Sequence, residues 1–420
     1  MMLLLAGCKK DEDKEAPRVE ILTPAEGAVL SIPDTLNVRV RCSDDRSLRS
    51  VTVTLTNSAG IPIAPGATAE LSGTQMEVEL TIVVTDETVT TGNGLLTARA
   101  SDGFQDGRAF RDVALMEAPL RRRGLFITTL SGSTTQIHRL DQSGSLSLAS
   151  TLPYANQLMD SHSASDRLVV AGSVNGPLVT FRTEPFGQVW QSPNLNFLPV
   201  PFHSGLHMGT DKVVYVATVD ERVQGYQVST GWQSYNAALQ SGWRVGHMVL
   251  TGDRLATEQY AVSGTDRRLT VYNRASGTAL DQYTLDLELA GMHALDDIRV
   301  VLLGKRGADG VVQQRDLSNG NIQEPLVLSG QPIRAACKIT ESTYALLAGN
   351  EVLRYTHPGS LATTLTTLSG TTMLTYDAWS GLIHVAAGNL LYSIDPLSGS
   401  TVATHTLPGP IQGVRAVLNR

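Results

Sequence analysis

The segment Leu391-Tyr392-Ser393-Ile394-Asp395-Pro396-Leu397-Ser398-Gly399 predicts a short strand that runs into a glycine turn. A glycine in the same setting recurs seven times along the chain, at Gly144, Gly187, Gly231, Gly277, Gly320, Gly359 and Gly399. Subtraction gives separations of 43, 44, 46, 43, 39 and 40 residues between successive glycines. A repeat of this length is typical of a four-stranded β-propeller blade.

Each repeat also contains one strongly apolar strand, such as residues 213–217 (VVYVA) or 344–347 (YALL). A continuous apolar run of this kind predicts a strand that is covered on both faces. Neighbouring blades of a propeller would supply that cover. An inner strand such as residues 332–336 precedes the apolar strand, and a short polar outer strand follows the glycine turn.

The two ends of the repeat region are incomplete in complementary ways. The first repeat begins at its apolar strand near Gly124, without an inner strand before it. The chain ends at residues 413–418 (GVRAVL), which have inner-strand character. We therefore expect residues 124–420 to form a seven-bladed propeller in which the C-terminal strand is the inner strand of the first blade.

A different rhythm runs through residues 17–118. Apolar side chains alternate with polar ones in residues 36–40 (LNVRV), 51–55 (VTVTL) and 76–80 (MEVEL). Alternation of this kind predicts antiparallel sheets with one buried face, and about a hundred such residues predict a β-sandwich. Residues 119–123, with the triplet Arg121-Arg122-Arg123, are interpreted as a solvated linker. With a β-sandwich before this linker and a propeller after it, the fold is expected to be all-β.

Two patterns resemble known families. Residues 17–24, with the form Pro-x-Val-x-Ile-x-x-Pro, resemble the start of the bacterial Ig-like modules of surface lipoproteins, although the antibody-type Cys…Trp…Cys pattern is missing. The turn pattern Tyr392, Asp395, Gly399 resembles the repeat of PQQ-like and WD-repeat-like propellers. This second resemblance is degenerate, so it implies the fold and not quinone chemistry.

The N-terminus resembles a targeting signal. Leu5-Ala6-Gly7-Cys8 is similar to a bacterial lipobox, in which the cysteine becomes acylated. The charged run at residues 9–15 resembles the surface-export signal of Bacteroidetes-type lipoproteins. Residues 1–16 are therefore expected to be a signal remnant and flexible tether. The resemblance implies an outer-membrane lipoprotein that is held by its lipid and exposed at the cell surface.

Composition restricts the partners. The chain has 420 residues and a formal net charge of -7, without a basic stripe, which argues against nucleic acid. Besides Cys8, the cysteines are Cys42 and Cys337, and both are expected to be buried free thiols.

The candidate site consists of histidines and arginines. His162, His207, His247 and His293 each lie a few residues before the apolar strand of their repeat, which predicts equivalent positions on inner strands around the central channel. Arg334 and Arg415 come from two further blades. Neutral imidazoles suit Zn²⁺, or they could hold a polar ligand, or they could simply bond backbone and water in a narrow channel.

A calcium site is a weaker hypothesis. Asp44, Asp45, Asp102 and Asp106 fall in predicted loops that could meet at one end of the sandwich. However, the chain has no Asp-x-Asp-x-Asp-Gly loop, and aspartate is also a common turn residue. No bound cofactor is predicted beyond these two possible metals.

Three functions remain open. The first is a binding protein of the cell envelope whose propeller displays a surface for a glycan or a protein. The second is an enzyme, either a polysaccharide lyase or a hydrolase, that uses the channel histidines. The third is a periplasmic factor for outer-membrane assembly, by analogy with propeller lipoproteins of that process. No catalytic motif is visible, so the sequence favours a protein that is not an enzyme.

Overall fold

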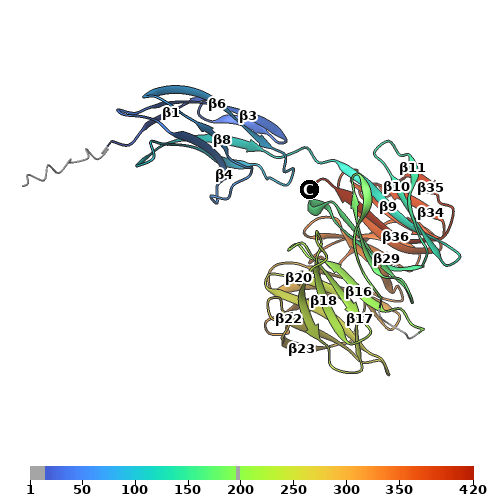
Figure 1. The fold of residues 1–420 in the computed structure, drawn as a ribbon. Helices are drawn as coiled ribbons and strands as arrows, with labels where there is room; N and C mark the ends of the chain where they lie inside the picture. The colour runs from blue at the N-terminus through green and yellow to red at the C-terminus, as the bar shows by residue number, and fades with distance from the viewer. Residues whose placement is uncertain (1–14, 195–198) are drawn as a thin grey trace, which may run out of the picture. The chain divides into compact units, whose positions relative to one another are not determined.

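The computed structural model describes residues 15–194 and 199–420 (Figure 1). The described residues form strands and a single 3₁₀ turn, η1 (Ser163–Ser165), which confirms the all-β prediction. In these ranges no helix has the length and apolar character needed to span a bilayer. The chain divides into two compact units, Met1–Leu120 with Arg420, and Arg121–Asn419. Cys8 and most of the expected tether lie outside the described residues.

The first unit is a sandwich of two sheets. One sheet has the order β1-β3-β6, with bounds Arg18–Thr23, Asp34–Ser43 and Gln75–Val84. The other has the order β2-β8-β7-β4-β5, with bounds Ala28–Ser31, Asp106–Met116, Gly92–Ser101, Ser50–Asn57 and Ala67–Glu70.

Period-two alternation explains the core of this unit. In β3 the side chains of Val38, Val40 and Cys42 are buried, while Asn37, Arg39 and Arg41 lie on the outer face. The buried side chains pack against alternate residues of β4 and β7 in one continuous core. Cys42 is a free buried thiol, as expected. The predicted sandwich is therefore confirmed.

The second unit contains seven four-stranded antiparallel sheets, numbered here as blades 1 to 7. Blade 1 has the order β36-β9-β10-β11, and its bounds are Ile411–Leu418, Arg122–Ser131, Thr134–Leu140 and Leu146–Leu152. Blade 2 contains β12 to β15, with bounds Asn156–His162, Arg167–Gly172, Leu178–Thr183 and Phe186–Ser192. Blade 3 contains β16 to β19, with bounds His203–Met208, Val213–Thr218, Arg222–Gln227 and Gln233–Ala238.

The remaining blades follow the same order along the chain. Blade 4 contains β20 to β23, with bounds Trp243–Thr251, Arg254–Ala261, Arg267–Asn273 and Ala279–Leu285. Blade 5 contains β24 to β27, with bounds Glu288–Ala294, Arg299–Arg306, Asp309–Asp316 and Ile322–Leu328. Blade 6 contains β28 to β31, with bounds Ile333–Lys338, Thr343–Ala348, Glu351–Thr356 and Ala362–Thr367. Blade 7 contains β32 to β35, with bounds Thr371–Asp377, Leu382–Ala387, Leu390–Ile394 and Thr401–Thr406.

The blades form a closed ring. Each inner strand contacts the inner strand of the next blade, from β12 through β16, β20, β24, β28 and β32 to β36, and β36 contacts β12 again. The C-terminal strand β36 pairs antiparallel with β9, with Arg415 opposite Phe126 (Figure 1). The second strands β17 and β29 are buried at every position because neighbouring blades cover both of their faces. The predicted seven-bladed, C-terminally closed propeller is confirmed.

The glycine repeat gives the period correctly but does not mark one uniform turn. Five of the seven glycines have a positive φ, between 70° and 82°. Gly187 and Gly359 do not, and Gly187 lies inside β15. Their two blades instead have a cis proline in the same connection, at Glu184–Pro185 and His357–Pro358.

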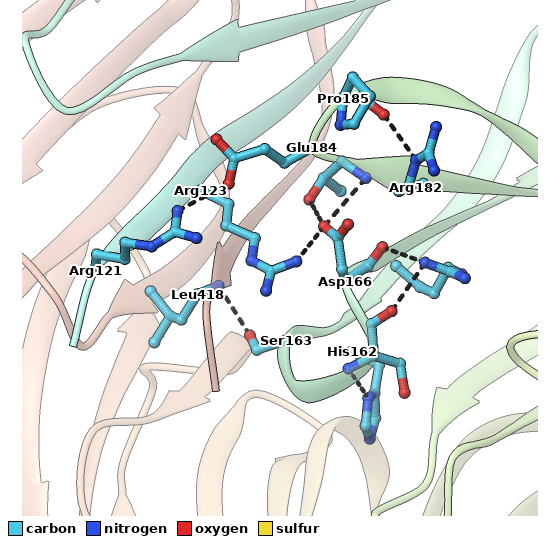
Figure 2. A network of polar contacts seen from close by, with 12 residues as sticks. Arg121, Arg123, His162, Ser163, Asp166, Arg182, Glu184, Pro185 and Leu418 are labelled. Atoms are coloured by element: carbon cyan, nitrogen blue, oxygen red, sulfur yellow. Dashed lines mark hydrogen bonds and ion pairs between the residues drawn. The ribbon is translucent and has the colours of Figure 1, made fainter. Parts of the chain in front are cut away.

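The interpretation of residues 119–123 as a solvated linker is wrong at its C-terminal end. Strand β9 already begins at Arg122, so the propeller starts earlier than the expected residue 124. Arg122 is only 6% exposed. Arg121 pairs with Glu184 at 2.8 Å, and Arg123 pairs with Asp166 at 2.8 Å (Figure 2). Arg121 and Arg123 therefore attach the start of the ring to blade 2.

Candidate functional site

A cavity of about 500 Å³ lies among the inner strands and receives side chains from all seven blades. In six blades the inner strand has a bulge near its start, and the residue two positions beyond the bulge contributes to the cavity lining. In blade 4 the residue at the corresponding register is Val249. From blade 1 to blade 7 this ring, here called the channel ring, consists of Arg415, Asp160, His207, Val249, His293, Cys337 and Thr375.

The prediction that four histidines share one position is therefore half correct. His207 and His293 belong to the channel ring. His247 also lines the cavity, but it lies in the irregular stretch of β20 between Val245 and Met248. His162 lies two residues beyond Asp160 and is not part of the lining, because η1 lengthens the connection after β12. Its Nδ1 accepts a hydrogen bond from the backbone N–H of Ser165 at 3.0 Å.

The two arginines also differ. Arg415 lies in the channel ring, as predicted. Arg334 does not, because it occupies the bulge between Ile333 and Ala335. Its side chain is exposed and donates to the carbonyl oxygen of Gly349. The prediction that Arg334 joins the channel set is therefore wrong.

Asp160 ties three blades together at the cavity. Its Oδ1 accepts from Arg415 Nε of blade 1 at 3.2 Å, and its Oδ2 accepts from the backbone N–H of Met208 of blade 3 at 2.9 Å. Asp160 itself belongs to blade 2. Both carboxylate oxygens are thus engaged in joining inner strands, which favours a positioning role for this group.

His247 is held by a buried carboxylate. Glu258 of β21 is 2% exposed, and its Oε2 accepts from His247 Nδ1 at 2.8 Å and from the His247 backbone N–H at 3.2 Å. Its Oε1 accepts from Arg267 Nη1 at 2.8 Å and from the backbone N–H of Leu289 at 3.2 Å. Glycine is needed at position 246, because a Cβ there would lie 2.7 Å from Glu258 Oε2.

These contacts determine the protonation of the pair. Burial alone would raise the pKa of Glu258, but the hydrogen bond and charge of His247, the Leu289 N–H and the Arg267 charge together lower it. Glu258 is therefore a carboxylate at neutral pH and can only accept hydrogen bonds. Because Glu258 can only accept, His247 Nδ1 carries a proton in this contact, and the neutral form of the ring keeps the Nε2 lone pair as an acceptor.

The two histidines of the channel ring are neutral. Burial lowers the pKa of His207, although Asp160 and Asp211 partly oppose this, and its Nε2 accepts from the backbone N–H of Leu250 at 3.2 Å. Burial also lowers the pKa of His293 to about 3, and Lys338 and the other two imidazoles add to the effect. His293 Nε2 is buried without a hydrogen-bond partner in the part of the chain that the structure describes.

Two more side chains complete the chemistry of the lining. Lys338 Nζ lies 2.6 Å from Oε2 of Glu341, whose side chain is 91% exposed. Burial raises the pKa of the Cys337 thiol to about 12, although the positive charge of Arg415 acts in the opposite direction. Cys337 is thus a protonated thiol and not an activated nucleophile.

Neither metal hypothesis gains support. Within residues 15–194 and 199–420, no group of three or more His, Cys, Asp and Glu is arranged to hold a metal ion. The three cavity histidines therefore do not form a zinc site. Asp44 and Asp102 instead cap turns, accepting from backbone N–H groups two and three residues ahead. Asp106 pairs with Arg99 at 2.5 Å, and Asp45 lies in the loop after β3.

Sequence reasoning missed four residues of the site: Asp160, Lys338, Glu258 and the role of Cys337 in the lining. Glu258 carried a signal, because a charged residue interrupts the apolar strand of its repeat. Cys337 was also accessible, because it lies six residues before the second strand of its repeat, as His207 does. Asp160 lies seven residues before its second strand and shares their register only through the strand pairing. The feature that the channel positions share is their register on the inner strand, and it is occupied by several residue types besides histidine.

A family model matches most of the first unit. Residues 17–98 match the family described as a bacterial Ig domain. No curated protein matches the sequence. A quinoprotein alcohol dehydrogenase-like protein from Bacteroides thetaiotaomicron is 10% identical, with 96% of this chain and 99% of that chain covered and a TM-score of 0.49.

Two further solved structures resemble the propeller. BamB from Moraxella catarrhalis is 14% identical over 60% of this chain and 76% of that chain, with a TM-score of 0.42. The propeller domain of Cps50 (Swd1) from Myceliophteria thermophila is 12% identical over 61% of this chain and 87% of that chain, with a TM-score of 0.49. These are likenesses of fold alone, and the blade count follows from the strand pairing.

Proposed function

We propose that the protein is a lipid-anchored binding protein of the cell envelope that holds a small polar ligand, such as a glycan end, in its propeller channel. The observation that supports this proposal is the cavity of about 500 Å³ whose lining includes three imidazoles, a guanidinium, an ammonium and three hydroxyls. A cavity of this size accommodates a ligand of one or two sugar rings.

The hydrogen-bonding groups of the lining suit a polyhydroxylated ligand. His247 Nε2 is an acceptor, whereas neutral His207 carries its proton on Nδ1 because its Nε2 accepts from Leu250. A sugar hydroxyl can donate to the first and accept from the second. The described lining contains no Trp, Tyr or Phe, so hydrogen bonds and not ring stacking would hold the ligand.

The tryptophans are mostly engaged elsewhere, which makes a stacking platform on the propeller less favourable. Trp190 Nε1 donates to the carbonyl oxygen of Val228 at 2.9 Å. Trp243 lies under the Arg268 guanidinium at 3.7 Å, and Trp379 lies under Arg122 at 5.0 Å. Trp232 is 69% exposed but stands singly.

A matched pair of variants tests channel binding. The full chain is screened for stabilisation by a panel of mono- and disaccharides, and the best binder is titrated by calorimetry. His207→Ala should abolish most of the binding, whereas His162→Ala should leave it unchanged because His162 is not part of the lining. Equal loss in both variants, or no binding by any member of the panel, would contradict the proposal.

The membrane anchor is proposed from the lipobox-like segment that ends at Cys8. Expression of the full chain in a bacterium that processes lipoproteins should place it in the membrane fraction, and Cys8→Ser should release it. Protease treatment of intact cells then separates surface exposure from a periplasmic orientation. Release of the unsubstituted chain into the soluble fraction would contradict the anchor.

One observation favours a second candidate, a polysaccharide lyase or hydrolase. The His247–Glu258 contact at 2.8 Å orients the imidazole of a lining residue, as in a general base held by a carboxylate. Incubation with acidic polysaccharides and measurement of new reducing ends would detect either reaction. Activity that His247→Gln removes would support an enzyme, and absence of new ends over the whole panel would reject it.

A further inference from the structure

The channel and the chain as a whole have opposite charge. The chain carries a net charge of -7. The ionic groups of the cavity lining are Arg415, Lys338 and Asp160, which together leave one excess positive charge. Among the described residues, three further carboxylates lie near this lining: Asp211, which pairs with Arg274 at 3.8 Å, Glu258, which pairs with Arg267 at 2.8 Å, and Glu341, which is exposed. A positive cavity in an acidic protein concentrates anions.

Arg415 has donors to spare for such an anion. Its Nε donates to Asp160 and its Nη1 donates to the carbonyl oxygen of Val414 at 2.9 Å. Nη2 has no hydrogen-bond partner among the described residues. The side chain is 38% exposed, so the guanidinium is fixed on one edge and accessible on the other. Fixed orientation by Asp160 lowers the entropy cost of binding a ligand group.

Lys338 provides a second cation from the inner strand of blade 6, which is separated from the strand of Arg415 by blade 7. Its partner Glu341 is almost fully exposed, and such pairs contribute little in water. Lys338 lies close enough to His293 for its charge to affect that imidazole, and Arg415 lies close enough to Cys337 to do the same. The two cations therefore lie on the inner strands on either side of blade 7.

His293 adds an unmet hydrogen bond at the same place. Its Nε2 is buried and has no partner in the described part of the chain, which is unusual for a buried polar atom. A ligand hydroxyl or a bound water in the cavity would supply the missing partner. Because the charge of Lys338 reaches this ring, one small ligand can present a hydroxyl to His293 and an anionic group to Lys338.

From these contacts we infer that the channel ligand is an acidic sugar, whose anionic group lies between Arg415 and Lys338 and whose hydroxyls meet His207, His247 and His293. This inference rests on the proposed channel binding and narrows its ligand class. A carboxylate and a phosphate ester share the required charge. The experiment therefore includes both forms.

The test is calorimetric titration of the full chain with D-galacturonate, D-glucuronate, a hexose phosphate, and neutral D-galactose and D-glucose. At least one acidic sugar should bind roughly tenfold or more tightly than its neutral parent, because one charge-assisted hydrogen bond accounts for about that factor. Its affinity should fall as salt is raised, whereas that of a neutral sugar should not.

Lys338→Met is the decisive variant, because its side chain has only an exposed partner and the substitution should not disturb folding. It should lower the affinity for the acidic sugar by roughly tenfold and leave that of the neutral sugar unchanged. Arg415→Gln should do the same, with thermal unfolding as a check on folding. Arg334→Gln is the matched control, because this inner-strand arginine is not part of the lining.

The outcomes separate the two proposals. Equal affinity for acidic and neutral sugars, or an equal loss in Arg334→Gln, overturns the acidic ligand but leaves channel binding intact. Binding by none of the five sugars overturns the acidic ligand, and the wider saccharide panel then decides whether channel binding survives. A preference for the phosphate or the carboxylate form identifies the source of the charge.

Discussion

Arg122 Nη1 donates to Asp377 Oδ2 at 2.9 Å, and this contact joins the first strand of the propeller to the inner strand of its last blade. Both side chains are buried, at 5% and 0% exposure. The Asp377 carboxylate also accepts from Ser380 Oγ and from the backbone N–H of Trp379. A buried ion pair thus lies where blade 1 and blade 7 of the ring meet.

Breaking this pair should weaken the ring. Arg122→Ala leaves the Asp377 charge buried without its counter-ion, and such changes typically cost about 3–5 kcal/mol. Chemical denaturation followed by fluorescence should show this loss. Arg121→Ala is the control, because Arg121 and Glu184 are both about 40% exposed and such pairs are worth about 0–1 kcal/mol. Similar losses in the two variants would contradict the assigned role.

Closure by the last strand makes a second prediction. Removal of residues 412–420 deletes most of β36, which pairs with β9 and contacts the inner strands β12 and β32. The truncated chain should lose the cooperative unfolding transition of the propeller, because every blade needs two neighbours to bury its faces. Circular dichroism during heating measures this, and removal of Arg420 alone serves as the control. A native melting curve for the truncated chain would refute closure by β36.

The ring could be predicted from the sequence because of the second strands. These strands are covered on both faces, so successive side chains such as Val216 and Leu346 are all buried, and apolar runs recur at a regular period. The closing strand was equally visible, since an inner strand is missing at the start of the repeats and present at the end. These are properties of single segments, which a sequence displays directly.

The channel could be predicted only in part, because its register depends on contacts between strands. His162, His247 and His207 each lie a few residues before the apolar strand of their repeat, so the sequence places them at equivalent positions. The structure separates them because η1 follows His162, and because Glu258 lies beneath an enlarged bulge at Gly246. Neither cause is visible in the local pattern. A bulge depends on a side chain from the neighbouring strand.

Acid should destabilise the fold in two stages, and the first comes from histidines. Burial lowers the pKa of seven imidazoles, at His138, His162, His203, His207, His293, His357 and His405. A group whose folded pKa is depressed contributes stability above its unfolded value, which is about 6.5 for histidine, and loses it as the pH falls. The free energy of unfolding should therefore decrease from about pH 6.5 downward.

The second stage comes from Asp377. Burial alone would raise its pKa, but His384, whose Nε2 lies 3.8 Å from Oδ2, the hydrogen bond from Ser380 and the charge of Arg122 lower it to about 2. Its contribution is complete above the unfolded value of about 3.9 and is lost as the pH falls toward 2. Urea denaturation at a series of pH values should show this second decrease, and Asp377→Asn should remove it. A stability that does not change below about pH 6.5 would contradict both stages.

Two turn glycines that look alike in the sequence should respond differently to substitution. Gly399 has a φ of 72°, and a Cβ there would lie 2.0 Å from the carbonyl oxygen of Leu365. Gly187 has no positive φ, and a Cβ there would meet nothing within 4 Å. Gly399→Ala should therefore cost more than about 1–2 kcal/mol, since the left-handed conformation alone costs that much. Gly187→Ala should change the free energy of unfolding by less than about 0.5 kcal/mol. Urea denaturation of both variants measures the two free-energy changes, and equal costs would contradict the predicted difference between the two turns.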